Sequence, residues 1–260
     1  GDGEIQTNEP SREEANFEIN AGASYASEDF TDLKKAFADA AALETDLFVS
    51  NVGGNGNWKV TAGNAYSGYV SGFEKVLPFL SVGIKLSNLW SEEIKGEVTG
   101  EGNAGETFSY RTSIAPSLFS IAAGVKLQTR RRPHEVALSG SLLIGPAFAN
   151  ATLKGNGAFM DRVHGFNSAV EYSVPMSGTG FYAELGAALE YLFSESVGLT
   201  LGCGYHYCVV GQMHSNANVD TDRDGVTDIH ANEKFTHING SDVVFDFNGL
   251  DVSGGMKIIF

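Results

Sequence analysis

The chain has 260 residues, a mean hydropathy of −0.09 and a formal net charge of −15. It contains no run of about eighteen apolar residues, which excludes a transmembrane helix but not a membrane-spanning β-barrel, whose strands are only half apolar. Nucleic-acid binding is not expected, because neutralising phosphates requires a basic surface and only 17 residues are Lys or Arg, against 32 Asp or Glu.

The N-terminal quarter of the chain predicts a tail, a strand and a helix. The chain opens without a signal peptide, as expected of an exported protein after processing, and residues 1–13 are polar enough to form a periplasmic tail. Apolar and polar residues then alternate over 16–25, which predicts a strand with two different faces. Residues 29–44 break this rhythm with apolar residues at helical spacing, which predicts a short amphipathic helix in the first connection.

Three positions are open for this helix. It is expected to pack on the rim of the folded strands. The alternatives are that it enters the interior as a plug, or that it lies in the membrane interface.

Seven further segments alternate in the same way as the first strand. They are residues 58–71, 80–90, 108–128, 136–148, 181–193, 197–209 and 245–260. Two of them change phase, near Pro116 and near Asn248, where one extra residue predicts a β-bulge. On this phasing, the apolar residues that precede each change of phase face outward. They include Phe108, Ile114, Phe245 and Phe247.

The connections between these segments differ in length. Short ones around residues 75, 131 and 195 alternate with long ones, at 27–57, 99–106, 151–177 and 214–241. This asymmetry is typical of outer-membrane barrels, which have short periplasmic turns and long extracellular loops. We therefore predict an all-β protein, a single antiparallel transmembrane barrel over residues 14–260. It has eight strands, or ten if 45–57 or 163–174 also pair, and both chain ends are periplasmic.

Charged residues recur on the polar faces of the predicted strands. The expected lumen network comprises Glu18, Lys85, Arg111, Lys126, Glu184, Glu190 and His206. An eight-stranded barrel is just wide enough for side chains to fill, and unpaired charges inside it are costly. We therefore expect pairing between Glu184 or Glu190 and Arg111 or Lys126. The alternative is a narrow conduit for small solutes.

The clearest chemical motif runs from residue 220 to residue 228, in the last long connection. Its carboxylates are those of Asp220, Asp222, Asp224 and Asp228. Carboxylates at such spacing converge on one hard cation, and the glycine at residue 225 permits the sharp turn between them. The first half matches an EF-hand loop, but Ala231 stands where that loop has its bidentate glutamate.

This segment is more similar to the DxDxDGxxD calcium loop of thrombospondin type 3 repeats. The resemblance implies a Ca²⁺ site formed by the side chains of Asp220, Asp222, Asp224 and Asp228 and the backbone carbonyl of Val226. We expect the cation to order this extracellular loop.

A second motif begins at His214, where the sequence reads His-Ser-Asn-Ala. It resembles the His-x-Ser-Asn-Ala element of PagL-type lipid A deacylases, which are also eight-stranded barrels. The resemblance implies His214 and Ser215 as base and nucleophile, with Glu233 orienting the histidine. Here the two residues are adjacent, so on a strand they point to opposite faces, and only a bulge restores the pair.

The last strand alternates regularly and ends on Phe260, which resembles the C-terminal signal of bacterial outer-membrane proteins. Across residues 14–260 the pattern resembles the OmpA-type family of small barrels. The resemblance implies a Gram-negative cell-surface protein in contact with outer-membrane lipids and lipopolysaccharide, and assembled by the barrel-assembly machinery through its C-terminal strand. An extracellular or envelope protein partner is also expected.

The expected function is non-enzymatic, a structural or surface-interaction role with a calcium-binding loop. The alternatives are a lipid A-modifying barrel enzyme and a narrow small-solute channel.

Overall fold

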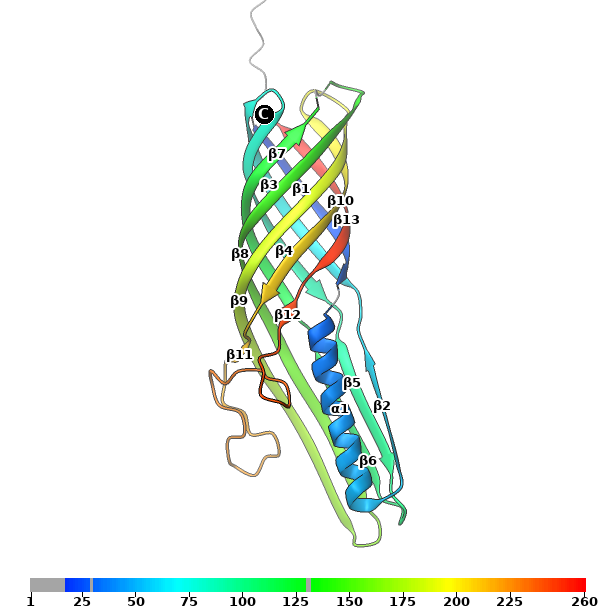
Figure 1. The fold of residues 1–260 in the computed structure, drawn as a ribbon. Coiled ribbons are helices and arrows are strands. Elements are labelled where there is room, and N and C mark those ends of the chain that lie inside the picture. Colours follow the sequence, from blue (N-terminus) through cyan, green and yellow to red (C-terminus); the bar gives the residue numbers. More distant parts are fainter. Residues whose placement is uncertain (1–16, 29, 130–131) are drawn as a thin grey trace, which may run out of the picture.

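The computed structural model describes residues 17–28, 30–129 and 132–260 (Figure 1). The tail expected at 1–13 lies outside these residues. The described chain is built of antiparallel strands and one helix, α1 (Thr31–Val52). In this part of the chain α1 is not long and apolar enough to cross a membrane.

Eight strands close into an antiparallel ring. In ring order they are β1 (Phe17–Glu28), β3 (Ala65–Leu77), β4 (Leu80–Ser91), β7 (Ser117–Gln128), β8 (Val136–Asp161), β9 (Phe166–Leu192), β10 (Val197–Val210) and β13 (Gly249–Ile259). β13 pairs with both β10 and β1, so the ring has no open edge. The predicted eight-stranded barrel is confirmed, and the ring does not contain the ten strands of the alternative.

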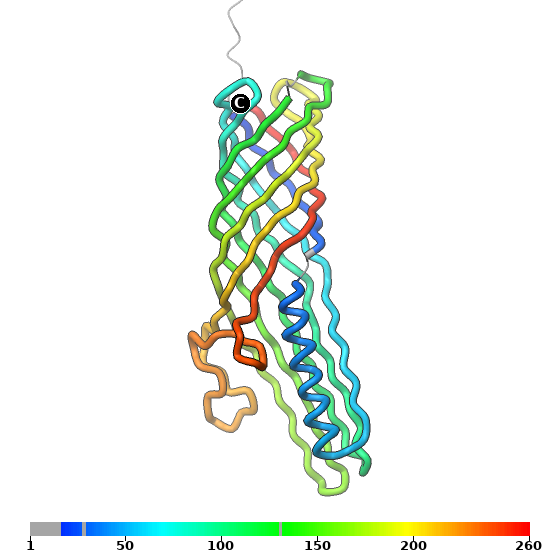
Figure 2. The backbone as a smooth tube through the Cα atoms, in the orientation of Figure 1, coloured from blue at the N-terminus to red at the C-terminus, as the bar shows by residue number. Residues whose placement is uncertain are grey.

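The two ends of the barrel differ. Phe17 and Phe260 exchange backbone hydrogen bonds at one end, and the short turns between β3 and β4 and between β9 and β10 lie there too (Figure 2). We call this the turn end. All the long connections emerge from the opposite end, which we call the head end.

The outer face of the barrel is apolar along its length. Large side chains such as Ile84, Leu142, Leu185, Leu201 and Leu250 are more than half exposed. They alternate with interior residues that are small or polar, as the sequence predicted. A continuous belt of exposed apolar side chains is costly in water and suits lipid acyl chains.

Beyond the head end, β8 and β9 continue as one long hairpin, along which further strands extend the same hydrogen-bonded sheet. These further strands are β2 (Asn55–Thr61), β5 (Ile94–Glu101), β6 (Thr107–Ile114) and β11 (His214–Ser215). They pair in the order β2-β5-β6-β8-β9-β11, and α1 lies along the sheet (Figure 1). We use the name head for these strands together with α1. The head includes β8 from residue 151 onward and β9 up to residue 177.

Helix α1 packs on the head sheet through residues spaced three or four apart. Its buried side chains are Leu33, Ala36, Phe37, Ala41, Thr45 and Phe48. A Cβ added to Gly96 would stand 3.1 Å from the Phe37 ring, and one added to Gly100 would stand 2.6 Å from the Phe48 ring. Glycine at these positions therefore lets the helix approach the sheet closely. The helix is longer than predicted and packs along this sheet beyond the rim, so it does not plug the lumen.

The segment expected as one bulged strand, 108–128, is two strands with different surroundings. β6 belongs to the head and β7 to the barrel, and both pair with β8, so the change of phase at Pro116 marks the passage from the head to the barrel. Ile114 is fully buried, and the Phe108 ring stacks on Phe48 at 5.4 Å, so neither faces outward as predicted. The Phe108 side of β6 is covered by α1 through Phe48, which is why an apolar residue there need not face lipid. In the same way, the segment 58–71 divides into β2 and β3.

The segments expected as loops are largely regular. Residues 151–177 are strand apart from the turn at 162–165, and 99–106 form the end of β5 and its turn into β6. Most of 27–57 is α1. These segments form secondary structure because strands that leave the barrel find partners in the head.

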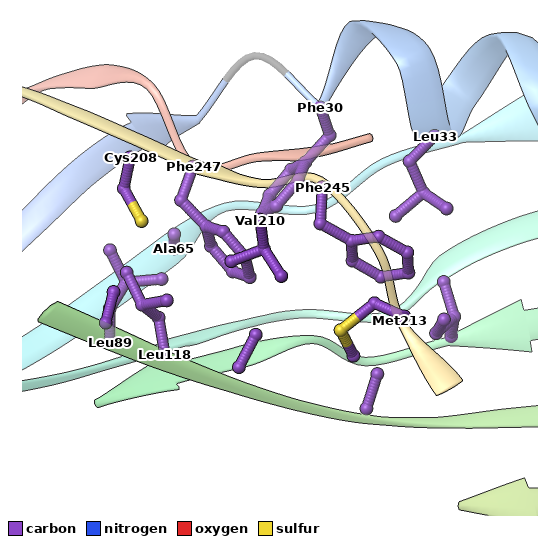
Figure 3. Close-up of a cluster of buried hydrophobic side chains, with 14 of the residues drawn as sticks. Phe30, Leu33, Ala65, Leu89, Leu118, Cys208, Val210, Met213, Phe245 and Phe247 are labelled. Carbon is purple, nitrogen blue, oxygen red and sulfur yellow. The ribbon is translucent and has the colours of Figure 1, made fainter. Parts of the chain in front are cut away.

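The last strand contains no bulge. β12 (Phe245–Asp246) and β13 keep one register against β10, since Val209 pairs with Asp246 and His206 pairs with Gly249. Phe245 and Phe247 therefore lie on the inner face and are fully buried, contrary to the prediction that they face outward. They belong to an apolar cluster that fills the head end of the barrel (Figure 3). The interior is polar towards the turn end and the middle of the barrel, but it is apolar at the head end. The rule that apolar residues face outward therefore gave the wrong side for Phe245 and Phe247.

Candidate functional site

Four charged side chains fill the barrel interior near the turn end. The Lys126 Nζ lies 2.5 Å from Glu18 Oε1 and 2.6 Å from Glu190 Oε1. Lys257 contacts Glu190, and its Nζ lies 3.5 Å from Glu18 Oε2. All four side chains are at most 6% exposed. We call these residues the charge quartet. Its two cations and two anions balance, which is the condition for burying charges without a large penalty.

A second polar group lies nearer the middle of the lumen. Lys85 Nζ lies 2.7 Å from both carboxylate oxygens of Glu184, which also accepts a hydrogen bond from the Tyr182 hydroxyl. His206 Nδ1 lies 3.7 Å from Asp251 Oδ1. The cavity among these groups has a volume of about 80 Å³. Such a volume is sufficient for ordered water, which needs a cavity of at least about 10–15 Å³.

The structure places six of the seven expected lumen residues inside the barrel and one outside it. Arg111 lies on the exposed face of β6 in the head, where its Nε is 3.4 Å from the Glu97 carboxylate. Of the pairings expected between these residues, the structure contains Lys126 with Glu190. Arg111 was misplaced because β6 was assigned to the barrel.

The head end of the lumen is filled by apolar side chains. Phe30, Phe245 and Phe247 are fully buried, and the Phe30 and Phe247 rings meet edge to face at 5.4 Å (Figure 3). Leu118 and Val210 complete the packing from the barrel wall. The small polar cavity is lined by Lys126 and Glu190 of the charge quartet.

The acidic motif forms a compact turn. One carboxylate oxygen each from Asp220, Asp222 and Asp224 lie within 4.8 Å of one another. Asp220 accepts hydrogen bonds from the Gly225 amide at 2.8 Å and the Arg223 amide at 2.6 Å, and Gly225 has a φ of 90°. Three convergent carboxylates around a glycine turn are the oxygen donors that Ca²⁺ prefers, so these residues fit that ion.

The other two expected ligands are placed differently. Asp228 Oδ2 accepts hydrogen bonds from the Thr221 amide at 2.7 Å and the Thr221 hydroxyl at 2.6 Å, and these bonds lower the pKa of Asp228. Its carboxylate is thus engaged by Thr221, outside the group of three. Val226 donates its amide to Asp224 Oδ1 at 2.7 Å.

The side chains of the three residues of the deacylase-like motif make separate hydrogen bonds, although the Ser215 amide donates to the Glu233 carbonyl at 2.8 Å. The Ser215 hydroxyl is buried and donates to the Ala217 carbonyl at 2.7 Å. His214 Nδ1 lies 3.2 Å from the Asn232 carbonyl. The Glu233 carboxylate accepts from the His230 amide at 2.8 Å. The structure therefore does not join the side chains of His214, Ser215 and Glu233 by hydrogen bonds as base, nucleophile and orienting group.

A pair of tyrosines in the head was not singled out by the sequence. The hydroxyls of Tyr110 and Tyr172 lie 2.6 Å apart. Tyr110 pairs across the sheet with Gly157, and Tyr172 pairs with Gly155. A side chain at either glycine would meet the partner ring. Two tyrosines that each pair with a glycine across the sheet would have indicated this contact. Recognising those pairs requires knowledge of the strand register.

The sequence matches no family model and no curated protein. Among solved structures, it is similar to the outer-membrane protein OprG from Pseudomonas aeruginosa, with 13% identity, coverage of 95% of this chain and 96% of that chain, and a TM-score of 0.42. Ail, the attachment invasion locus protein of Yersinia pestis, solved with the heparin analogue sucrose octasulfate, has 12% identity, coverages of 94% and 99%, and a TM-score of 0.36. Neisserial surface protein A has 10% identity, coverages of 94% and 97%, and a TM-score of 0.32. All three are small outer-membrane β-barrel proteins.

Proposed function

We propose that this protein is a non-enzymatic outer-membrane barrel that presents its head at the cell surface. The observation that carries the proposal is a closed eight-stranded ring with an apolar exterior and an interior filled at both ends. Such a barrel anchors a domain in a lipid bilayer, but its packed interior opposes the passage of solutes. The head extends well beyond the barrel and is the part available to a partner.

We propose an orientation on the basis of the same architecture. The turn end, with Phe17 and Phe260, faces the periplasm, and the head faces outward. The barrel wall then contacts outer-membrane lipids and lipopolysaccharide. The C-terminal strand β13 is the element read by the barrel-assembly machinery, and an extracellular or envelope protein is the partner of the head. The OmpA-type pattern of the sequence supports this assignment.

Conductance in planar lipid bilayers tests the anchoring role. The purified protein is expected to give no single-channel steps in membranes where a general porin conducts. We attribute this expected closure to two buried groups, the charge quartet and the apolar cluster, so opening one of them alone should leave the other in place. Reproducible single-channel steps from the wild-type protein would establish a solute channel and overturn the proposal.

We further propose that the loop at 214–241 binds Ca²⁺ through Asp220, Asp222 and Asp224. The positive charge of the ion would balance the negative charges of the three adjacent carboxylates. Asp228 joins them when it leaves Thr221, and Val226 contributes its carbonyl, as the thrombospondin type 3 resemblance implies. Bound calcium is then expected to order the loop against the head.

Calorimetric titration with CaCl₂ tests this site. Saturable binding is expected for the wild-type protein and is lost in Asp222→Asn combined with Asp224→Asn. Asp46→Asn is the matched control, because it removes an exposed carboxylate from α1. Calcium should also protect residues 214–241 from proteolysis. The absence of binding heat, together with unchanged cleavage of this loop, would refute the calcium site.

A further inference from the structure

A cavity of about 420 Å³ lies where α1, the head sheet and the acidic loop meet. Aromatic side chains of the sheet form much of its wall: Phe108, Tyr110, Phe159 and Tyr172. The carboxylate-bearing residues on its lining are Glu44 of α1 and Asp228 of the loop. The volume falls within the range of about 300–1,000 Å³ that is usual for small-molecule sites.

Glu44 is the most unusual residue of this lining. It is partly buried, and burial raises the pKa of its carboxyl group. Within the described residues, no hydrogen bond or ion pair engages this carboxylate, and burial is the cause of its raised pKa. Removing a carboxylate from water without a partner is unfavourable. A cationic ligand in the cavity would supply that partner.

The tyrosine pair contributes a second feature. Burial raises the pKa of Tyr110 and of Tyr172, and the negative charge of Glu44 adds to both shifts. Both hydroxyls therefore stay protonated at neutral pH, and each keeps a lone pair that can accept a hydrogen bond. The residual charge of the wall is thus negative, since no basic side chain lines this cavity among the described residues.

We propose that this cavity binds a small organic cation of the ammonium class. Aromatic faces attract such cations through the ring quadrupole, and a nearby carboxylate strengthens that attraction. Glu44 provides the charge, while Phe108, Tyr110 and Tyr172 provide the aromatic wall. A bare metal ion suits the three-aspartate turn better, because metal ions of the calcium type require several oxygen donors.

The site is adjacent to the proposed calcium turn but does not depend on it. Asp228 and Thr221 line the cavity, and their mutual hydrogen bonds hold Asp228 on this side of the loop. Recruiting Asp228 to calcium would remove a carboxylate from the cavity. Binding is therefore measured in EDTA first, so that failure of the calcium site leaves this result unaffected.

The test is calorimetric titration of the full chain with choline, in maltoside micelles that lack choline headgroups. Saturable binding is expected, at least tenfold tighter than that of 3,3-dimethylbutanol, the neutral isostere of choline. Glu44→Gln should weaken choline binding at least tenfold. Glu101→Gln, which removes an exposed charge elsewhere in the head, should not change it.

Native folding of each variant is checked by its electrophoretic mobility before and after heating. If Glu44→Gln does not fold, Asp228→Asn provides the second variant, and it too should weaken choline binding. Absence of saturable choline binding to the wild-type protein would overturn the proposal. Equal binding of choline and its neutral isostere, or unchanged affinity in both charge variants, would also overturn it.

Discussion

Replacing Lys126 with methionine probes whether the charge quartet is as dry as its burial indicates. The Lys126 side chain is 6% exposed and bridges Glu18 and Glu190, which are 4% and 1% exposed. Methionine fills a similar volume without the charge. The variant leaves two carboxylates to share Lys257, so the barrel interior gains one uncompensated negative charge.

The expected cost follows from that imbalance. Breaking a buried ion pair by removing one partner typically costs about 3–5 kcal/mol. Removing Glu190 as well restores neutrality, because Glu18 and Lys257 remain together with Nζ and Oε2 3.5 Å apart. The double variant Lys126→Met with Glu190→Gln should therefore recover most of the loss, to about 0–2 kcal/mol.

Urea unfolding in lipid vesicles, followed by the fluorescence of the two tryptophans, measures both quantities. With an m-value of about 2 kcal/mol/M, a loss of about 4 kcal/mol lowers the unfolding midpoint by about 2 M. Lys95→Met is the control. It breaks the partly exposed pair with Glu93, whose atoms lie 3.2 Å apart, and should cost about 0–1 kcal/mol.

One result would refute this reasoning. If Lys126→Met costs no more than Lys95→Met, water screens the charge quartet, and the turn end of the lumen is hydrated. A double variant no more stable than the single one would show that the residues do not act as a balanced group.

Three further changes test other parts of the fold. Phe247→Ala removes a fully buried ring from the apolar cluster and should cost about 3–5 kcal/mol in the same unfolding assay. Gly100→Val places a Cβ 2.6 Å from the Phe48 ring, so α1 should lift from the head sheet and become more susceptible to protease. Burial raises the pKa of Asp32, but hydrogen bonds from the Val244 amide and from His237 lower it by more. The pKa of Asp32 therefore lies below its usual range. That stabilisation is present above the unfolded pKa of about 3.9 and is lost as the pH falls through the folded value, which an NMR titration of the Val244 amide should show.

Each of these changes has an outcome that would contradict it. A loss below 1 kcal/mol in Phe247→Ala would mean that the cluster closes over the gap. Gly211→Val is the control for the helix, because a Cβ there meets no atom within 4 Å, and equal proteolysis of both variants would exclude a specific clash. A Val244 amide signal that does not change between pH 6 and pH 2.5 would remove Asp32 as the titrating group.

The barrel was predictable because its outer face meets a single environment. On β10 and β13, residues such as Leu199, Leu201 and Leu250 meet lipid-like surroundings, so period-two alternation assigns them correctly. The rule fails at Phe245 and Phe247, where the interior is itself apolar. It also fails at Ile114, which is fully buried in the apolar cluster.

The head could not be derived from local pattern because its partners are distant in sequence. Arg111 pairs with Asn156 across β6 and β8, and Asn156 pairs with Glu171 of β9. Alternation specifies the two faces of a strand, but not the sheet to which it belongs. The acidic turn was easier to predict, since its three carboxylates lie within five residues. The aromatic cavity was not, because Glu44, Tyr110 and Tyr172 come from three separate elements.

The apolar cluster connects the closed lumen to the head. The Phe30 ring packs on Phe247 inside the barrel mouth, and Asp32 in the first turn of α1 accepts a hydrogen bond from the Val244 amide. Phe245 in turn meets Phe235 of the long loop edge to face at 6.0 Å. Any movement that cleared the lumen at this end would also release the first turn of the helix and the base of the loop. Opening a channel at this end would therefore also disrupt the contacts that hold the head. This packing favours a barrel that anchors the head over one that conducts solutes.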